Sequence, residues 1–491
     1  MTTPREHNTS EPAATAPASV DGALLPARPR WRRLLRDLVD AVRGTSTDYT
    51  SGSLGRAIFL LSIPMMLEMA MESLFAVVDM FFVARIGPSA AATVGLTESV
   101  LTLVYAVAIG LSMGTTALVA RRIGEKNPKD AADSAVQAVL VGIAASIPFS
   151  LIGLFFAKDL LRLMGADEWC LTHGYRYTVW MFGGNAVIML LFIINAIFRS
   201  AGDAAVAMRV LWLANGINLV LDPVLIYGWG PIPAMGIEGA AVATNIGRGA
   251  AVLVQLLVLL RGAKHIRVAM NQVRLDLPVM WRLVRTSLGG IGQFIIATSS
   301  WVALVRIVSH FGSEAVAGYT IAVRIFIFTL LPAWGLSNAA ATLVGQNLGA
   351  KQPVRAERAV WICGWINTVF LALVSVLYII FDEELVRIFT NDPKAIAHGA
   401  DCLRIVSYGY VIFAWGMVMP QAFNGAGDTI TPTKINFVCF WVLEIPLAYG
   451  LAMTAEQGPP GVFWSIVVAE TAAGVIGILL FRRGKWKRTV V

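Results

Sequence analysis

Long apolar runs, separated by short polar segments, recur about twelve times along the chain. A helix of about 20 apolar residues spans the roughly 30 Å of hydrocarbon in a bilayer. The pattern therefore predicts twelve membrane-spanning helices. The expected spans are 57–84, 93–120, 134–157, 174–198, 208–228, 237–260, 284–309, 317–345, 359–381, 402–423, 434–454 and 461–482.

The same short patterns occur twice at a fixed offset of 225 residues, which is the distance from Gly87 to Gly312. The other repeated pairs are Val119…Gly124-x-Lys126-x-Pro128 with Val344…Gly349-x-Lys351-x-Pro353, Phe198-x-x-Ala201-Gly202-Asp203 with Phe423-x-x-Ala426-Gly427-Asp428, and Gly236 with Gly461. Six helices per copy is an even number, so both copies have the same orientation in the membrane. The fold class expected is therefore all-α integral membrane, with two pseudo-symmetric six-helix lobes around a central site.

Composition and loop charge indicate the cellular location. The chain is 57% hydrophobic and only 14% charged, which excludes an ordinary soluble protein. Alternate loops are rich in Lys and Arg, and this positive-inside pattern predicts an inner (plasma) membrane protein with both termini in the cytoplasm. Because these cations are spread over many loops, we expect no nucleic-acid partner. The expected parts are a cytoplasmic tail (1–56), an N-lobe (57–260), a cytoplasmic linker (261–283), a C-lobe (284–482) and a basic tail (483–491).

The N-terminal tail contains two different kinds of sequence. The first thirty residues are rich in Ala, Pro, Thr and Ser, which is typical of disorder. After them, apolar residues share one helical face among arginines: Trp31, Leu34, Leu35, Leu38 and Val42, with Arg32, Arg33, Arg36 and Arg43. This pattern predicts a short amphipathic helix on the anionic lipids of the inner leaflet, with a solvated charged linker as the alternative.

Acidic residues inside the first span are the first candidates for function. Glu68, Glu72 and Asp79 lie within about 40° of one another on a helix, so they form one acidic stripe. Each acid at mid-membrane costs roughly 2.5–3.5 kcal/mol, so it needs a partner, a cavity or a role. Asp79 is a candidate for cation coupling, and Glu68 and Glu72 for a substrate cavity. The alternative is that the acids pair with Arg248 or another buried cation.

The fifth span supplies a second candidate set. Asn218 and Asp222 are one helical turn apart and share a face, and Pro223 loosens the backbone beside the acid. A carboxylate beside an amide can hold a proton or a small cation, although Asp222 as a helix cap is the alternative. Asn195 is expected to join this coupling cluster, and Tyr177 to line the same cavity.

At these residues the chain strongly resembles the multidrug and toxic compound extrusion (MATE) family. The segments that carry the resemblance are Ile63-Pro64…Val78-Asp79 through Gly87, Asn218 through Pro223, and Val344 through Ala350. The likeness covers about residues 57–482. It implies two six-helix lobes around a central cavity, and cation-coupled antiport that exports drugs, often amphipathic cations. It also implies that the protein is not an enzyme.

Within this family the chain is similar to the DinF type. NorM-type members carry carboxylates in helices seven and ten, whereas here helix seven offers Gln293, a further cavity candidate, and helix ten has no acid. The resemblance therefore implies a coupling site in the N-lobe, at Asp79, Asn218, Asp222 and Asn195. Ala240 lacks the hydroxyl that would help to bind Na⁺, so the expected coupling ion is H⁺, with Na⁺ as the alternative.

Other functions remain as alternatives. A flippase for lipid-linked sugars would use the same architecture, but the N-lobe is acidic and not cationic. A channel would need filter-like loops, and an enzyme would need a nucleophile or paired-acid motif at the interface. The expected partners are drug substrates, H⁺ or Na⁺ and membrane lipids; we expect a monomer with no cofactor and no metal.

Overall fold

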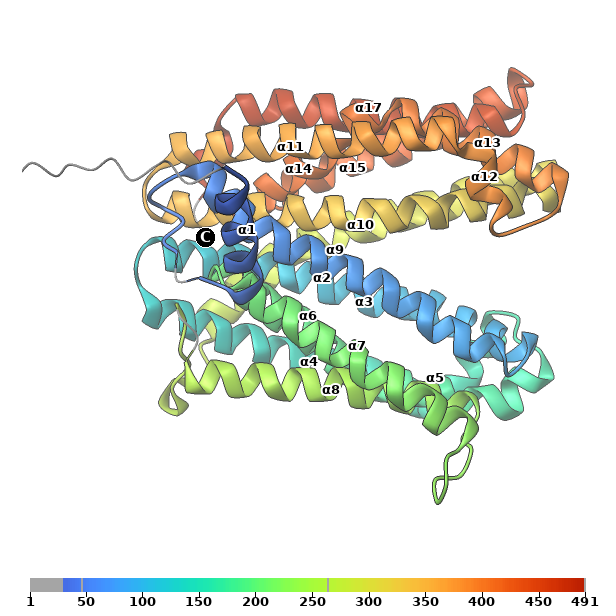
Figure 1. The fold of residues 1–491 in the computed structure, drawn as a ribbon, viewed down its shortest axis with the longest axis horizontal. Helices are drawn as coiled ribbons and strands as arrows, with labels where there is room; N and C mark the ends of the chain where they lie inside the picture. The colour runs from blue at the N-terminus through green and yellow to red at the C-terminus, as the bar shows by residue number, and fades with distance from the viewer. Residues whose placement is uncertain (1–29, 46, 263–264, 490–491) are drawn as a thin grey trace, which may run out of the picture.

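The computed structural model describes residues 30–45, 47–262 and 265–489, and nearly all of them are helical (Figure 1). Within these residues, eleven helical spans are long and apolar enough to cross a membrane, and a bent pair of helices makes up to twelve. The spans run side by side in one elongated bundle. The first described helix and the C-terminus both lie at one end of this bundle, which we call the terminal end.

The first repeat forms the N-lobe. Its helices are α2 (Leu54–Ala84), α3 (Pro88–Gly124), α4 (Pro128–Leu163), the π-helical turn η1 (Cys170–Gly174), α5 (Tyr175–Gly183), α6 (Asn185–Ser200), α7 (Ala204–Tyr227) and α8 (Ile237–Arg261). The six spans expected for this half coincide with these helices. Helix α2 continues through Pro64 without a break.

The second repeat forms the C-lobe. Its helices are α9 (Leu277–Val308), η3 (Ser309–Phe311), α10 (Ser313–Gly349), α11 (Pro353–Ile380), α12 (Asp382–Arg387), α13 (Pro393–Tyr408), α14 (Tyr410–Ala426), α15 (Ile430–Asn436), η4 (Phe437–Glu444), α16 (Ile445–Tyr449), η5 (Gly450–Thr454) and α17 (Pro459–Arg482). The eleventh span thus alternates between α-helix and π-helix. The chain ends in the short helix η6 (Lys485–Arg488).

Breaks in the helices follow the sequence repeat. The fourth span is interrupted at Gly184, between α5 and α6, and the tenth span bends by 65° at Gly409, between α13 and α14. Gly409 is the repeat counterpart of Gly184. Lys126 and Lys351 are likewise counterparts, and both take a left-handed backbone conformation, with φ of 56° and 57°. The duplication therefore extends to the irregular parts of the backbone.

The lobes meet where α3 packs against α10, and through two symmetry-related contacts, α2 against α10 and α9 against α3. A Cβ atom at Gly110 would collide with Ile291 on α9, and one at the counterpart Gly335 would collide with the backbone of Met65 on α2. Small residues allow helix backbones to approach closely where lipid gives no hydrophobic driving force. Glycine at these two positions therefore sets the distance between the lobes.

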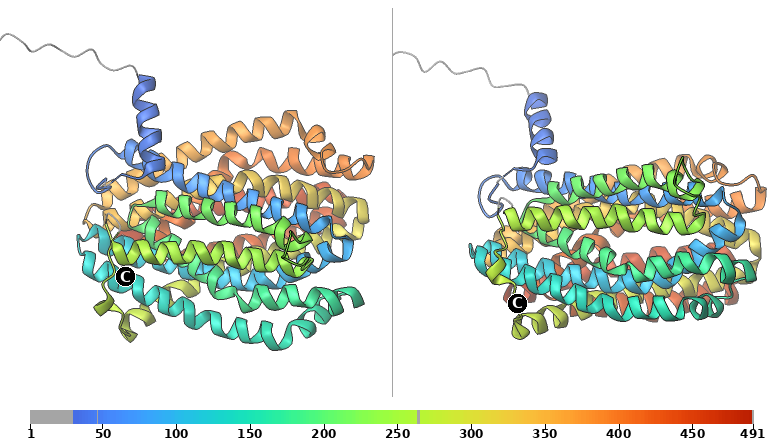
Figure 2. Two further views of the ribbon diagram at one scale, coloured as in Figure 1. Left: turned by 60° about the horizontal axis from the view of Figure 1, so that its bottom comes forward. Right: turned by 90° about the horizontal axis from the view of Figure 1, so that it is seen from below.

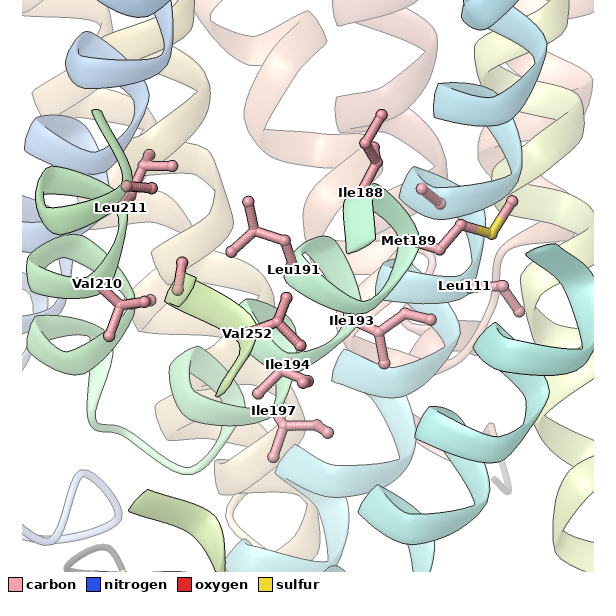
Figure 3. Packing of buried hydrophobic residues seen from close by; sticks show 14 of the residues in the cluster. Leu111, Ile188, Met189, Leu191, Ile193, Ile194, Ile197, Val210, Leu211 and Val252 are labelled. Atoms are coloured by element: carbon pink, nitrogen blue, oxygen red, sulfur yellow. The ribbon is translucent and has the colours of Figure 1, made fainter. Parts of the chain in front are cut away.

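Helix α6 lies at the centre of the N-lobe and is buried on almost all sides. Figure 3 shows its isoleucines and leucines packed between residues of α3, α7 and α8, among them Leu111, Leu211 and Val252. A helix that is apolar all round belongs in the interior of a bundle. This packing holds the polar residues at the two ends of α6 in fixed positions.

Outside the spans, the structure describes the amphipathic segment of the tail and the linker between the lobes. The predicted amphipathic segment forms helix α1 (Arg30–Arg43), whose axis lies across that of the bundle at the terminal end (Figure 2). Arg56 of α2 holds it through Asp37 and Asp40, each at 3.1 Å. Its binding to lipid stays a prediction, and the expected disorder of the first residues lies outside the described part. The linker is shorter than expected, because α9 already begins at Leu277, where Asp276 caps it and Pro278 fits the first turn.

Candidate cation and substrate sites in the N-lobe

The acids of α2 all face the interior of the N-lobe, as the predicted stripe requires. Glu68 forms an ion pair with Arg199 at 2.6 Å, and Glu72 forms one with Arg248 at 3.0 Å. The alternative interpretation, an ion pair with a buried arginine, therefore applies to both glutamates. Asp79 is buried and forms no ion pair among the described side chains, and its Oδ1 accepts no hydrogen bond there.

Asp79 lies close enough to Asp222 of α7 for their charges to interact. Asn218 Nδ2 donates to Asp222 Oδ1 at 3.0 Å and to Thr244 Oγ1 of α8 at 3.3 Å. Asp222 has no exposed surface, and its Oδ2 accepts no hydrogen bond from any described group. Buried carboxylate oxygens without donors are costly, and binding a proton or a small cation would satisfy them. The structure thus brings Asp79, Asn218 and Asp222 together.

Thr244 was not anticipated as a neighbour of this cluster. The sequence argument considered only Ala240 on α8, which carries no hydroxyl, but the hydroxyl of Thr244 lies one turn further on. Thr244, Arg248 and Gln255 fall within about 40° of one another on α8 and form a polar stripe on its inner face. A search of this span for polar residues at helical spacing would have found the stripe.

Arg248 is the most connected member of the α8 stripe. Besides its ion pair with Glu72, Nη1 donates to Tyr105 Oη at 3.3 Å, and the guanidinium lies 4.8 Å from the centre of the Phe75 ring. The side chain is only 5% exposed. A buried arginine needs such a complete set of partners, because an unpaired charge at this depth is expensive.

The remaining predicted residues lie around these groups. Asn195 does not bond to Asn218 or Asp222; its Oδ1 accepts a hydrogen bond from Gln255 Nε2 at 2.5 Å. Tyr177 is buried on α5, in electrostatic contact with Asp79. Gln293 of α9 exchanges hydrogen bonds with Asn424, at 3.0 and 3.2 Å.

A cavity of about 150 Å³ lies between the two lobes. Glu68, Glu72 and Asn195 line it, whereas Tyr177 and Gln293 are not among its lining residues. Its polar wall continues with Arg199, Asn338, Gln421 and Asn424, and its apolar wall includes Met69, Met113, Phe192 and Trp334. Aromatic and methionine side chains accept flat apolar ligands of varied shape, and carboxylates add attraction for cations. Asp79 and Asp222 are not part of the lining and lie further from the terminal end.

The MatE family model matches this chain twice, over residues 64–224 and 291–450, once for each repeat. Together these matches cover well over half of the sequence. The chain belongs to the MatE family.

Curated MatE relatives align over most of both chains. The probable multidrug resistance protein NorM of Thermotoga maritima is 28% identical over 446 residues, which are 88% of this chain and 93% of that protein. The probable multidrug resistance protein YoeA of Bacillus subtilis is 25% identical over 89% of this chain and 95% of its own length. The FAD transporter of Shewanella oneidensis is 27% identical over 81% and 88%.

Solved MATE structures share the fold. A crystal structure of MATE in complex with MaL6 has a TM-score of 0.83 at 26% identity, covering 92% of this chain and 99% of that one. An outward-facing MATE transporter has a TM-score of 0.84 at 25% identity, covering 91% and 99%. The protein is therefore a membrane-embedded MATE efflux transporter and not an enzyme, while its assignment to the DinF type stays a prediction.

Proposed function

We propose that this protein is a proton-coupled antiporter that exports amphipathic cationic drugs across the plasma membrane. The observation that supports this best is the buried cluster of Asp79, Asn218 and Asp222, with two carboxylate oxygens that accept no hydrogen bond from described groups. Protons arriving from outside bind these carboxylates, and the drug leaves the cavity between the lobes. Opening toward the cytoplasm then releases the protons.

The orientation follows from the proposed cytoplasmic position of both termini. At the terminal end the lobes touch closely: a Cβ at Gly124 would collide with the carbonyl of Gln346, and Arg121 donates to the carbonyl of Ala426 at 3.4 Å. On this orientation the observed state is closed toward the cytoplasm. Proton entry then gains about 2.3 kcal/mol per 100 mV of membrane potential, and export of a singly charged cation costs the same amount, so in one-for-one exchange the pH gradient supplies the driving force.

Protons fit the cluster better than Na⁺ does. Asn218 turns its NH₂ group toward both Asp222 and Thr244, so a donor occupies the space between these oxygens. A sodium ion needs several converging oxygen ligands, whereas a proton needs one carboxylate oxygen.

Transport by the purified protein in liposomes tests this proposal. When the cytoplasmic side of the protein faces the compartment that holds the dye, an imposed pH gradient should drive transport of ethidium, a flat cation, in sodium-free buffer. A protonophore should stop it. Strict dependence on a sodium gradient with no response to protonophore would establish the sodium-coupled alternative. If neither a proton gradient nor a sodium gradient moves the dye, the result would favour the flippase.

A further inference from the structure

Two sets of polar contacts, one at the cavity and one at the buried cluster, share one face of α8. At the cavity, Glu72 forms its ion pair with Arg248. One turn along the same face of α8, Thr244 accepts a hydrogen bond from Asn218, which also donates to Asp222. The close contact between α7 and α8 leaves little freedom here, because a Cβ at Gly247 would collide with the carbonyl of Ala214. Arg248 on α8 is thus held at a fixed distance from Asn218 and Asp222 on α7.

Arg248 interacts with two carboxylates of α2, Glu72 and Asp79. Glu72 faces the cavity with 26% of its side chain exposed, while Asp79, two turns along α2, is buried within electrostatic reach of the same guanidinium. The other ionisable groups that act on Arg248 or Asp79 are Tyr105 and Glu98 on α3, Tyr177 on α5 and Asp222 on α7. Apart from Arg248, none of these groups supplies a positive charge.

We propose that Arg248 is the coupling residue that links proton binding at Asp79 to cation binding at Glu72. This inference rests on the proposed function. When Asp79 is deprotonated, its negative charge competes for Arg248, and Glu72 is available to a cationic drug. When Asp79 is protonated, Arg248 pairs fully with Glu72, so the cavity loses its free carboxylate and the cation is released.

The physical basis is competition of two carboxylates for one buried cation. In a medium of low dielectric constant a charge a few ångströms away interacts strongly, so neutralising one anion strengthens the pairing of the cation with the other. The second anion need not move, because the arginine side chain is long and flexible. Uncharged substrates do not compete for Glu72, so this coupling acts on cations.

Equilibrium binding of ethidium to the purified full-length protein in detergent tests the role of Arg248. Between about pH 8 and about pH 5.5, the affinity of the wild type should fall by roughly tenfold, within the usual range for coupled sites. Arg248→Lys keeps a cation and should retain most of this change. The charge-balanced double variant Glu72→Gln/Arg248→Gln should bind ethidium more weakly at high pH and show less than about threefold dependence on pH.

Two further variants separate the possible failures. Arg209→Gln is the matched control, because Arg209 is an arginine of the same lobe whose guanidinium donates to the carbonyl of Ala205 on its own helix; it should behave as wild type. Asp79→Asn should remove the pH dependence. If it does so while Glu72→Gln/Arg248→Gln keeps a wild-type pH dependence, the role of Arg248 is refuted and proton coupling stands. If Asp79→Asn also keeps it, the proposed function itself fails.

Discussion

The two lobes share one architecture but carry different chemistry at corresponding positions. In the N-lobe, Glu68 and Arg199 form a buried ion pair at 2.6 Å. Their repeat counterparts in the C-lobe, Gln293 and Asn424, form a neutral hydrogen-bonded pair at 3.0 Å. The duplication has therefore kept the contact between the first and fourth spans of each lobe while its charge differs. Both lobes thus have the same side-chain contact, but only the pair in the N-lobe is charged.

The same comparison shows that the two acids of the cluster, Asp79 and Asp222, have no acidic counterparts in the C-lobe. The counterparts of Asp79 and Asp222 in the C-lobe are Leu304 and Leu447, and the counterpart of Arg248 is Ala473. The C-lobe has acids of its own within its spans, Glu444 and Glu470, and Glu444 accepts a hydrogen bond from Ser300 at 2.5 Å. Because internal repeats in transporters move as two bodies around a site, we expect that the acids of the N-lobe can bias that movement.

The largest effect is expected from the N-lobe carboxylates. Asp79→Asn and Asp222→Asn each replace a buried acid with a neutral amide of the same shape, so neither can bind or release a proton. Both variants should insert and fold, yet lose gradient-driven efflux of ethidium in liposomes. Size-exclusion profiles and melting temperatures in detergent serve as the folding control. Efflux at the wild-type rate in either variant would show that the N-lobe cluster does not couple transport.

The sequence predicted much of this comparison. The spans and the repeat follow from apolar runs long enough for a bilayer, and Asp79, Asn218 and Asp222 stand out because hydrocarbon excludes such residues. The choice of partners could not be predicted in the same way. Whether Glu68 meets Arg199 or Arg248 depends on the rotation of α2 against α6 and α8, which packing determines.

Part of the missing information was nevertheless present in the repeat. The pairing of Gln293 with Asn424 and of Glu68 with Arg199 obeys the same offset, as do the helix breaks at Gly184 and Gly409. A contact found in one copy therefore predicts the contact in the other. The α8 stripe has no counterpart of this kind, because Arg248 corresponds to Ala473, so only helical spacing could have revealed it.

A smaller effect, on stability more than on coupling, is expected at the symmetric pair. Glu68→Gln leaves the buried guanidinium of Arg199 without a counter-charge, which should cost about 3–5 kcal/mol. The double variant Glu68→Gln/Arg199→Asn gives the N-lobe the neutral pair of the C-lobe and should recover most of the loss. Melting temperatures in detergent measure both changes. Equal melting of wild type and Glu68→Gln would mean that the ion pair contributes nothing to the fold.

The smallest effect is expected at Glu444, one of the acids within the C-lobe spans. Glu444→Gln removes a buried carboxylate, but its amide oxygen can still accept the hydrogen bond of Ser300, so little packing or bonding is lost. If coupling belongs to the N-lobe alone, efflux driven by a pH gradient should change by about twofold or less, the size of a modest hydrogen-bond effect. The same liposomes and dye that test Asp79→Asn give a direct comparison. Loss of coupling in Glu444→Gln with normal melting would place a proton site in both lobes, and the chemical difference between them would then no longer explain which lobe responds to protons.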